Sequence, residues 1–203
     1  MTNVPGPGGG GRVDRAAEPS PDEADPAWAH EAIHLVDYHL DWPRLAAAFG
    51  REVADAVGVE ADQVQHIGST AVPGLAAKPV IDLQVAVDDL DGTTTRVVDA
   101  LNEAGWVFVP PGLDPMPWRR FFVRPSADQQ HRLAHLHLIE RGDPELDLQV
   151  KFREALRADD TVRDRYADLK HQLARQHAEH RGRYTDAKSA FVTAVLAGET
   201  PPP

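Results

Sequence analysis

An α+β fold is predicted by two features of the sequence. Segments with strand-like patterns come first along the chain, and segments with helical spacing of apolar residues close it. The chain has 203 residues, of which 42% are hydrophobic, and this is enough to bury one sizeable core. We therefore expect a single domain at residues 28–198, between a disordered Gly/Pro-rich tail at 1–27 and a short flexible tail at 199–203.

The strand predictions rest on alternation with a period of two residues. In the clearest segment, 133–139, His135 and His137 share one face and the leucines between them share the other. Asp82 and Gln84 share the polar face of a second, mostly apolar segment. The predicted strands are 63–67, 79–87, 106–109, 119–124 and 133–139, with a short edge strand at 33–36.

The helix predictions rest on end signals and on spacing. Pro43 fits the first turn of a helix, Gly105 fits the end of another, and Asp143 is the expected N-cap of a third. The predicted helices are 43–57, 93–104, 144–157, 161–177 and 185–196, so that a helical block closes the chain.

Composition excludes several classes of function. The net charge of −11 provides no general attraction for DNA or RNA, so bulk nucleic acid is not an expected partner. The absence of cysteine removes disulfides, thiolate metal sites and cysteine nucleophiles. No apolar stretch approaches the roughly 18 residues of a membrane span, and no secretory signal is visible. We expect a cytoplasmic protein without a membrane partner.

The segment Gly68-Ser69-Thr70 is the central candidate for phosphate binding. It lies fourteen residues before Asp82, which is on the next predicted strand. Glycine lets backbone N–H groups approach phosphate oxygens, and Ser69 or Thr70 supplies a hydroxyl. A carboxylate on a rigid strand can hold a divalent metal that bridges those phosphates. By itself a Gly-Ser pair is common in ordinary turns, but an unpaired carboxylate inside an apolar strand is costly, which favours a site at Asp82.

A longer motif adds a family resemblance. Residues 66–83 (HIGSTAVPGLAAKPVIDL) resemble the signature of the GrpB family, and RRFF at 119–122, HLHL at 135–138 and FREALR at 152–157 match it further along. The resemblance covers roughly residues 34–197. It implies a nucleotidyltransferase-like fold, a mixed sheet flanked by helices, and it extends to a domain fused to some bacterial dephospho-CoA kinases. This chain lacks the phosphate-binding loop of a kinase.

One position departs from the pattern of active nucleotidyltransferases, which usually carry two acids two residues apart on this strand. Here the pair is Asp82 and Gln84, and glutamine brings no charge. We predict a metal site at Asp82, Gln84 and His137, with His135 binding substrate. Mg or Mn is the expected metal. Zn or Ni stays open, because imidazole is a poor ligand for Mg²⁺ and a better one for Mn²⁺, Zn²⁺ or Ni²⁺. The predicted catalytic residues are Asp82, Ser69 and His137. The alternative for the two histidines is a pair of hydrogen-bonded strand residues.

Cationic side chains complete the predicted phosphate site. Lys78, Arg119 and Arg120 are assigned to phosphate, although on one strand only one of the two arginines can face the site. Tyr184 and Lys188 lie four residues apart and share a helix face, where Tyr184 is placed to stack on a base. The alternative for each arginine is a solvated surface charge, and the alternative for Tyr184 is that it caps the helical block.

Three functions are carried forward. The first is a metal-dependent nucleotidyltransferase that binds a nucleotide such as ATP and moves NMP to an unknown small acceptor. The second is a non-catalytic nucleotide- or CoA-binding accessory module, favoured by Gln84 and by the kinase-fused relatives. The third is a divalent-metal enzyme of another class that uses Asp82, His135 and His137.

Overall fold

The computed structural model describes residues 26–176 and 187–201, and within them the chain forms a mixed five-stranded sheet. The strand order is β1-β2-β5-β4-β3, with β2 and β5 paired in parallel at the centre and the other pairs antiparallel. The strands are β1 (Val64–Ile67), β2 (Ile81–Val87), β3 (Val107–Val109), β4 (Arg119–Pro125) and β5 (Arg132–Glu140).

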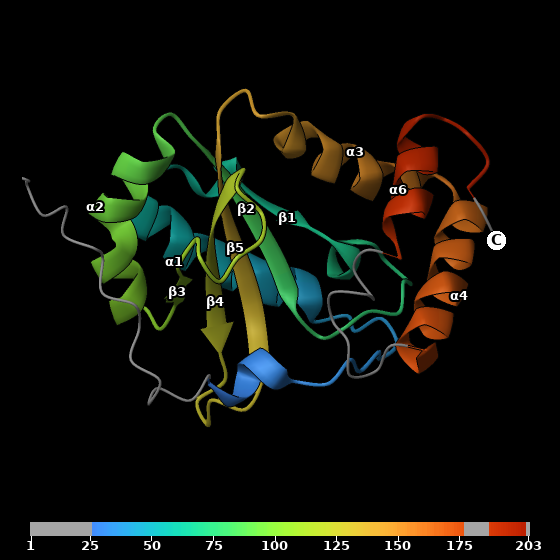
Figure 1. The fold of residues 1–203 in the computed structure, drawn as a ribbon, viewed down its shortest axis with the longest axis horizontal. Helices are drawn as coiled ribbons and strands as arrows, with labels where there is room; N and C mark the ends of the chain where they lie inside the picture. The colour runs from blue at the N-terminus through green and yellow to red at the C-terminus, as the bar shows by residue number, and fades with distance from the viewer. Residues whose placement is uncertain (1–25, 177–186, 202–203) are drawn as a thin grey trace, which may run out of the picture.

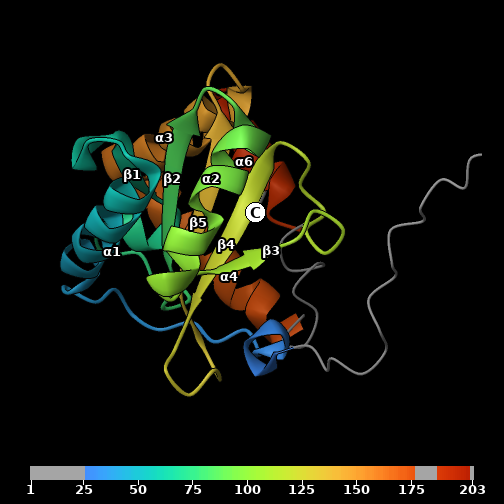
Figure 2. The ribbon, with the colours of Figure 1, turned by 90° about the vertical axis from the view of Figure 1, so that its left-hand side faces the viewer.

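Two groups of helices flank the strands. In Figure 1, α2 lies on the left, α1 passes behind the strands, and α4 and α6 lie on the right; Figure 2 shows α2 in front of the strands. The α-helices are α1 (Trp42–Val57), α2 (Leu90–Glu103), α3 (Pro144–Ala158), α4 (Asp160–Gln176) and α6 (Ser189–Leu196). Short 3-10 turns are η1 (Ala27–His30), η2 (Ala61–Gln63) and η3 (Ser69–Ala71).

The main core lies between the sheet and the pair α1 and α2. Leu83 and Leu136 are buried at 1% and 0% exposure in this cluster, and Phe122 contributes from β4. Val53 of α1 and Leu101 of α2 meet them from the helix side. The helices of the C-terminal block instead pack on one another and on the segment after β1, through Val72, Leu75, Leu156, Tyr166 and Phe191.

The α+β class, the mixed sheet flanked by helices and the C-terminal helical block of the predicted nucleotidyltransferase-like fold are confirmed. Asp143 caps α3 as predicted, accepting a hydrogen bond from the Glu145 N–H at 2.9 Å. Helix α2 begins at Leu90, three residues before the predicted start, because Asp89 caps it by accepting from the Gly92 N–H.

Other boundary predictions have different outcomes. The predicted edge strand at 33–36 is wrong, because only Val36 pairs, in a single bridge to Ala77. The predicted start of the last helix at Thr185 lies outside the described residues. Among the residues that the structure describes, no helix is both long enough and apolar enough to cross a membrane.

Candidate functional site

Asp82, His135 and His137 lie together on the sheet face that points away from the main core. Asp82 is opposite His135 across the parallel pair of β2 and β5, and Gln84 is opposite His137. Asp82 Oδ1 is 2.8 Å from His135 Nδ1 and 3.9 Å from His137 Nε2. The side chain of Asp82 is 29% exposed, that of His135 is 19% exposed and that of His137 is 11% exposed. The cluster is therefore reached from solvent mainly through the carboxylate.

The loop after β1 places its backbone against Asp82. Gly68 has φ 69° and ψ −171°, a combination that side-chain-bearing residues adopt only under strain. A Cβ on Gly68 would clash with Asp82 Oδ2, so this approach requires glycine. Ser69, which opens η3, is half-buried beside it. The predicted loop and the predicted carboxylate are thus adjacent in space.

Electrostatics keep Asp82 ionised and both histidines neutral. Burial alone would raise the pKa of Asp82, but contacts with His135 and His137 outweigh burial and hold that pKa well below its ordinary value. Burial lowers the pKa of His135 to about 4, against the opposing effect of Asp82. Burial also lowers the pKa of His137. At neutral pH the cluster presents one carboxylate and two neutral imidazoles.

Of the two arginines that open β4, only Arg119 belongs to the site. Its guanidinium donates to both carboxylate oxygens of Asp114, at 2.8 and 2.9 Å, and to His137 Nδ1 at 2.7 Å. Arg120 points to the opposite face of the sheet, where it pairs with Asp91 at 2.6 Å. The assignment of Arg120 to the substrate site is therefore corrected, because neighbouring residues of a strand face opposite ways.

Thr70 supports the loop from within. It is 1% exposed, and its hydroxyl lies 3.0 Å from His66 Nε2 and donates to the Val80 carbonyl. The carbonyl of His66 in turn accepts from Arg153 of α3 at 2.7 Å. Burial, together with nearby arginines, lowers the pKa of His66 to about 4. Thr70, which the sequence assigns to phosphate, therefore lies in the support of the loop rather than at its open surface.

Lys188 reaches the site from the start of α6. Burial lowers its pKa to about 8, and the charge of Asp82 acts in the opposite direction, which places the ammonium within electrostatic range of that carboxylate. Lys78 is half-buried on the segment between the loop and β2. Tyr184, the predicted base-stacking residue, lies outside the described residues.

Two charged residues near the site were missed by sequence reasoning. Asp114 lies in the Pro-rich connection between β3 and β4, where no periodic pattern marks it. Lys170 is 2% exposed, donates to the Ala76 carbonyl, and has a pKa lowered to about 7 by burial and by Lys188. Its position between two apolar residues at helical spacing, Tyr166 and Leu173, is a signal that identifies it as inward-facing.

The possible metal ligands differ from the predicted set. Among the described residues, Asp82, His135 and His137 each offer an atom within 4.8 Å of the others. Gln84 is 2% exposed and its amide donates to the Leu146 carbonyl at 3.0 Å, while its Oε1 has no hydrogen-bond partner among those residues. One carboxylate with two imidazoles fits Mn²⁺, Zn²⁺ or Ni²⁺ better than Mg²⁺.

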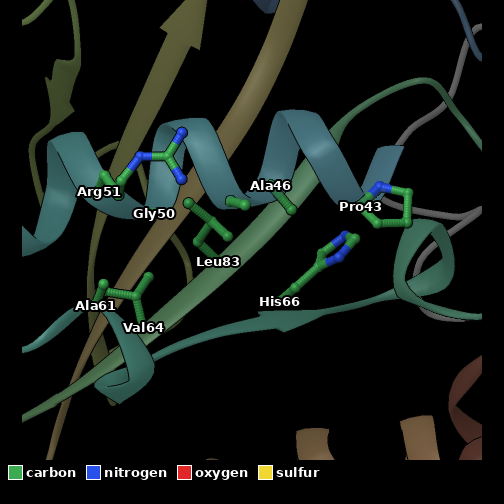
Figure 3. A pocket seen from close by; sticks show the side chains of 9 residues that line it. Pro43, Ala46, Gly50, Arg51, Ala61, Val64, His66 and Leu83 are labelled. Carbon is green, nitrogen blue, oxygen red and sulfur yellow. The ribbon is translucent and has the colours of Figure 1, made fainter. Parts of the chain in front are cut away.

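A separate pocket of about 410 Å³ lies between α1 and β1. Figure 3 shows Ala46 and Gly50 on the helix side, with the ring of His66 pointing from β1 toward Pro43. Asp82, His135 and His137 do not line it. His66, one of the residues that line it, contacts the loop at 68–70 through the Thr70 hydroxyl.

The comparisons with known proteins identify the family. A model of the GrpB protein family matches residues 32–197. The chain belongs to the GrpB family. A UPF0157 protein of Halalkalibacterium halodurans is 35% identical over 167 residues, which cover 81% of each chain. The crystal structure of the conserved protein GrpB from Enterococcus faecalis has 25% identity and a TM-score of 0.66, covering 81% of this chain and 96% of that one.

The predicted resemblance to kinase-fused domains is also confirmed. A dephospho-CoA kinase of Mycobacterium leprae is 29% identical over 198 residues, covering 83% of this chain and 43% of that protein. This chain therefore corresponds to less than half of the kinase.

Proposed function

We propose that this GrpB-family protein binds the phosphates of a nucleotide such as ATP, together with a divalent metal, and transfers NMP to a small acceptor. The observation that carries the proposal is the contact between the Gly68 backbone and the Asp82 carboxylate. Phosphate needs a backbone that it can approach closely, and a bridging metal needs an anionic ligand beside that backbone. Both requirements meet at this point of the fold.

Each nearby side chain has a role in this proposal. Asp82 holds the metal, which when bound neutralises charge on the phosphates. Gly68 and Ser69 contact phosphate oxygens through the backbone and the hydroxyl. Lys188 supplies positive charge at the rim, as does Lys78. These residues orient the α-phosphorus toward the acceptor. Arg119 contributes positive charge on the side where pyrophosphate departs.

Binding and turnover are tested separately. Calorimetry with ATP and Mn²⁺ should show binding that falls at least tenfold in Asp82→Asn, because the metal loses its anionic ligand. Asp88→Asn is the matched control, since Asp88 is exposed and pairs only with Arg141 among the contacts described. A pyrophosphate-release screen over NTPs, Mn²⁺, Zn²⁺ and Mg²⁺, and metabolite acceptors tests transfer. ATP binding without turnover in any combination would reject transfer and leave binding.

A non-catalytic nucleotide- or CoA-binding module is the second proposal. It is favoured by Gln84, whose amide is hydrogen-bonded to α3 where an active enzyme of this fold usually carries a second acid. The similarity to a dephospho-CoA kinase suggests CoA or dephospho-CoA as the ligand to try first. Calorimetry with ATP, CoA and dephospho-CoA distinguishes these ligands, and failure of all three to bind would reject the module.

A further inference from the structure

The two histidines of the cluster have different partners on their ring nitrogens. His135 places Nδ1 2.8 Å from Asp82 Oδ1, and its Nε2 is buried with no hydrogen-bond partner among the described residues. His137 places Nδ1 2.7 Å from the Arg119 guanidinium and turns Nε2 toward Asp82 at 3.9 Å. The chemistry of these partners determines where each proton lies.

A guanidinium has only N–H donors, so His137 Nδ1 must accept from Arg119 and must carry a lone pair. The proton of the neutral ring is then on Nε2, where it faces the Asp82 carboxylate. An ionised carboxylate only accepts, so His135 must donate from Nδ1 and keep its lone pair on Nε2. The neighbouring histidines therefore have opposite tautomers.

Arg119 is itself held in place, which makes the arrangement of His137 persistent. Asp114, whose side chain is 5% exposed, accepts two hydrogen bonds from the guanidinium. The guanidinium carbon lies 4.2 Å from the centre of the Phe121 ring and 5.3 Å from that of Trp118. The Trp118 ring also stacks on His137, with an interplanar angle of 11°.

We propose that Arg119 makes His137 a hydrogen-bond donor for a substrate oxyanion rather than a metal ligand, so that metal binding depends on Asp82. A ligating nitrogen needs its lone pair, and a ligating histidine usually donates its other N–H to an acceptor. Arg119 offers His137 no acceptor. His137 thus takes the substrate-binding role that the sequence gives to His135, while His135 is held by Asp82. The tautomer assignment of His137 rests on its contact with the Arg119 guanidinium, while the identification of the oxyanion as phosphate rests on the proposed function.

Nitrogen-15 NMR of the histidine rings tests the tautomers directly in the wild-type protein at neutral pH. Long-range ¹H–¹⁵N correlations should show an unprotonated Nδ1 and a protonated Nε2 in His137, with the reverse in His135. His135→Gln and His137→Gln assign the two rings, because each variant removes one set of signals. A protonated Nδ1 in His137 would overturn the proposal whatever the protein binds.

Zn²⁺ titration by calorimetry tests the effect of Arg119. The double variant Arg119→Met with Asp114→Asn removes the guanidinium without leaving a buried carboxylate unpaired, and it should bind Zn²⁺ about tenfold more tightly than wild type. Arg120→Met, on the opposite face, is the matched control and should match wild type. A double variant that differs from wild type no more than Arg120→Met does would contradict the proposal. If the double variant fails to fold, the NMR measurement still decides.

Titration with tripolyphosphate tests the donor role. His137→Gln keeps an N–H donor and should bind within a few-fold of wild type, whereas His137→Leu should bind about tenfold more weakly. Equal affinity of the two variants would refute the donor role. Absence of tripolyphosphate and ATP binding in every protein would refute both the proposed function and the phosphate assignment, and would leave the tautomers to the NMR result.

Discussion

Side chains on the two faces of the central strands are held in place in different ways, and two neighbouring residues of β5 show the contrast. Leu136 is fully buried against the layer of α1 and α2, where it contacts other apolar side chains without regard to direction. His137, its neighbour, is fixed by directed contacts to Arg119 and Asp82 on the other face. Burial of apolar area stabilises the first face, and pairwise polar geometry organises the second.

This difference predicts that effects on stability and effects on ligand binding are separable in this fold. The apolar face tolerates changes that keep volume, because close packing constrains shape more than chemistry. The polar face tolerates few changes of chemistry, since an unpaired charge or donor is costly at low exposure. A substitution on the apolar face should therefore leave ligand affinity intact, and a substitution on the polar face should leave the apolar packing intact.

The largest loss of stability is expected on the apolar face. Leu136→Ala should lower the free energy of unfolding by about 3–4 kcal/mol, through lost apolar burial and the remaining cavity. Urea denaturation measures this change. Affinity for tripolyphosphate should stay at the wild-type value at temperatures where the variant is folded, and a parallel loss of affinity would show that the two faces are coupled.

A smaller loss of stability with a complete loss of binding is expected at Gly68. Gly68→Ala introduces backbone strain and a clash with Asp82 Oδ2, so we expect about 2–3 kcal/mol of destabilisation and no measurable tripolyphosphate binding. Gly58→Ala is the control, because Gly58 also has positive φ but no atom within 4 Å of its added Cβ. Gly58→Ala should lower the free energy of unfolding by about 1 kcal/mol and should still bind tripolyphosphate. Similar results for both variants would mean that backbone strain, and not proximity to Asp82, causes the loss of tripolyphosphate binding.

Lys170 predicts a pH dependence of stability. Its folded pKa of about 7 is below the ordinary value of 10.5, so the unfolded chain binds more protons between these values and stability rises with pH across that range. Between pH 7 and 9 the free energy of unfolding of the wild type should rise by up to about 2 kcal/mol relative to that of Lys170→Met, because the pKa of Lys170 differs between the folded and unfolded chain. Denaturation of both proteins at the two pH values measures it. A constant difference between them would contradict the lowered pKa.

The smallest effect is expected at Arg120. Its partner Asp91 is 77% exposed, so Arg120→Gln should change the free energy of unfolding by less than about 1 kcal/mol. Nucleotide and metal affinities, measured by calorimetry, should match wild type because the side chain is on the opposite face from Asp82. A marked loss of ATP affinity would place Arg120 in the substrate site after all.

Much of the local structure follows from the sequence alone. The alternation at 133–139 correctly predicts that His135 and His137 share a face, because strand geometry has a period of two. The Gly68 loop and the Asp82 strand are predicted as neighbours, and Asp143 as a cap, because glycine and aspartate have strong local preferences. The family was also predicted, from the motif at 66–83.

Tertiary structure decided what depends on pairing between distant segments. The salt bridge of Arg119 with Asp114, the choice of Arg119 over Arg120, and the contact of Gln84 with α3 join residues whose proximity no local pattern encodes. Sequence spacing shows which side chains share a face, but the partner of each nitrogen depends on how the strands and loops pack. For that reason the sequence predicted roles for both histidines, while only the fold could distinguish the partners of their ring nitrogens.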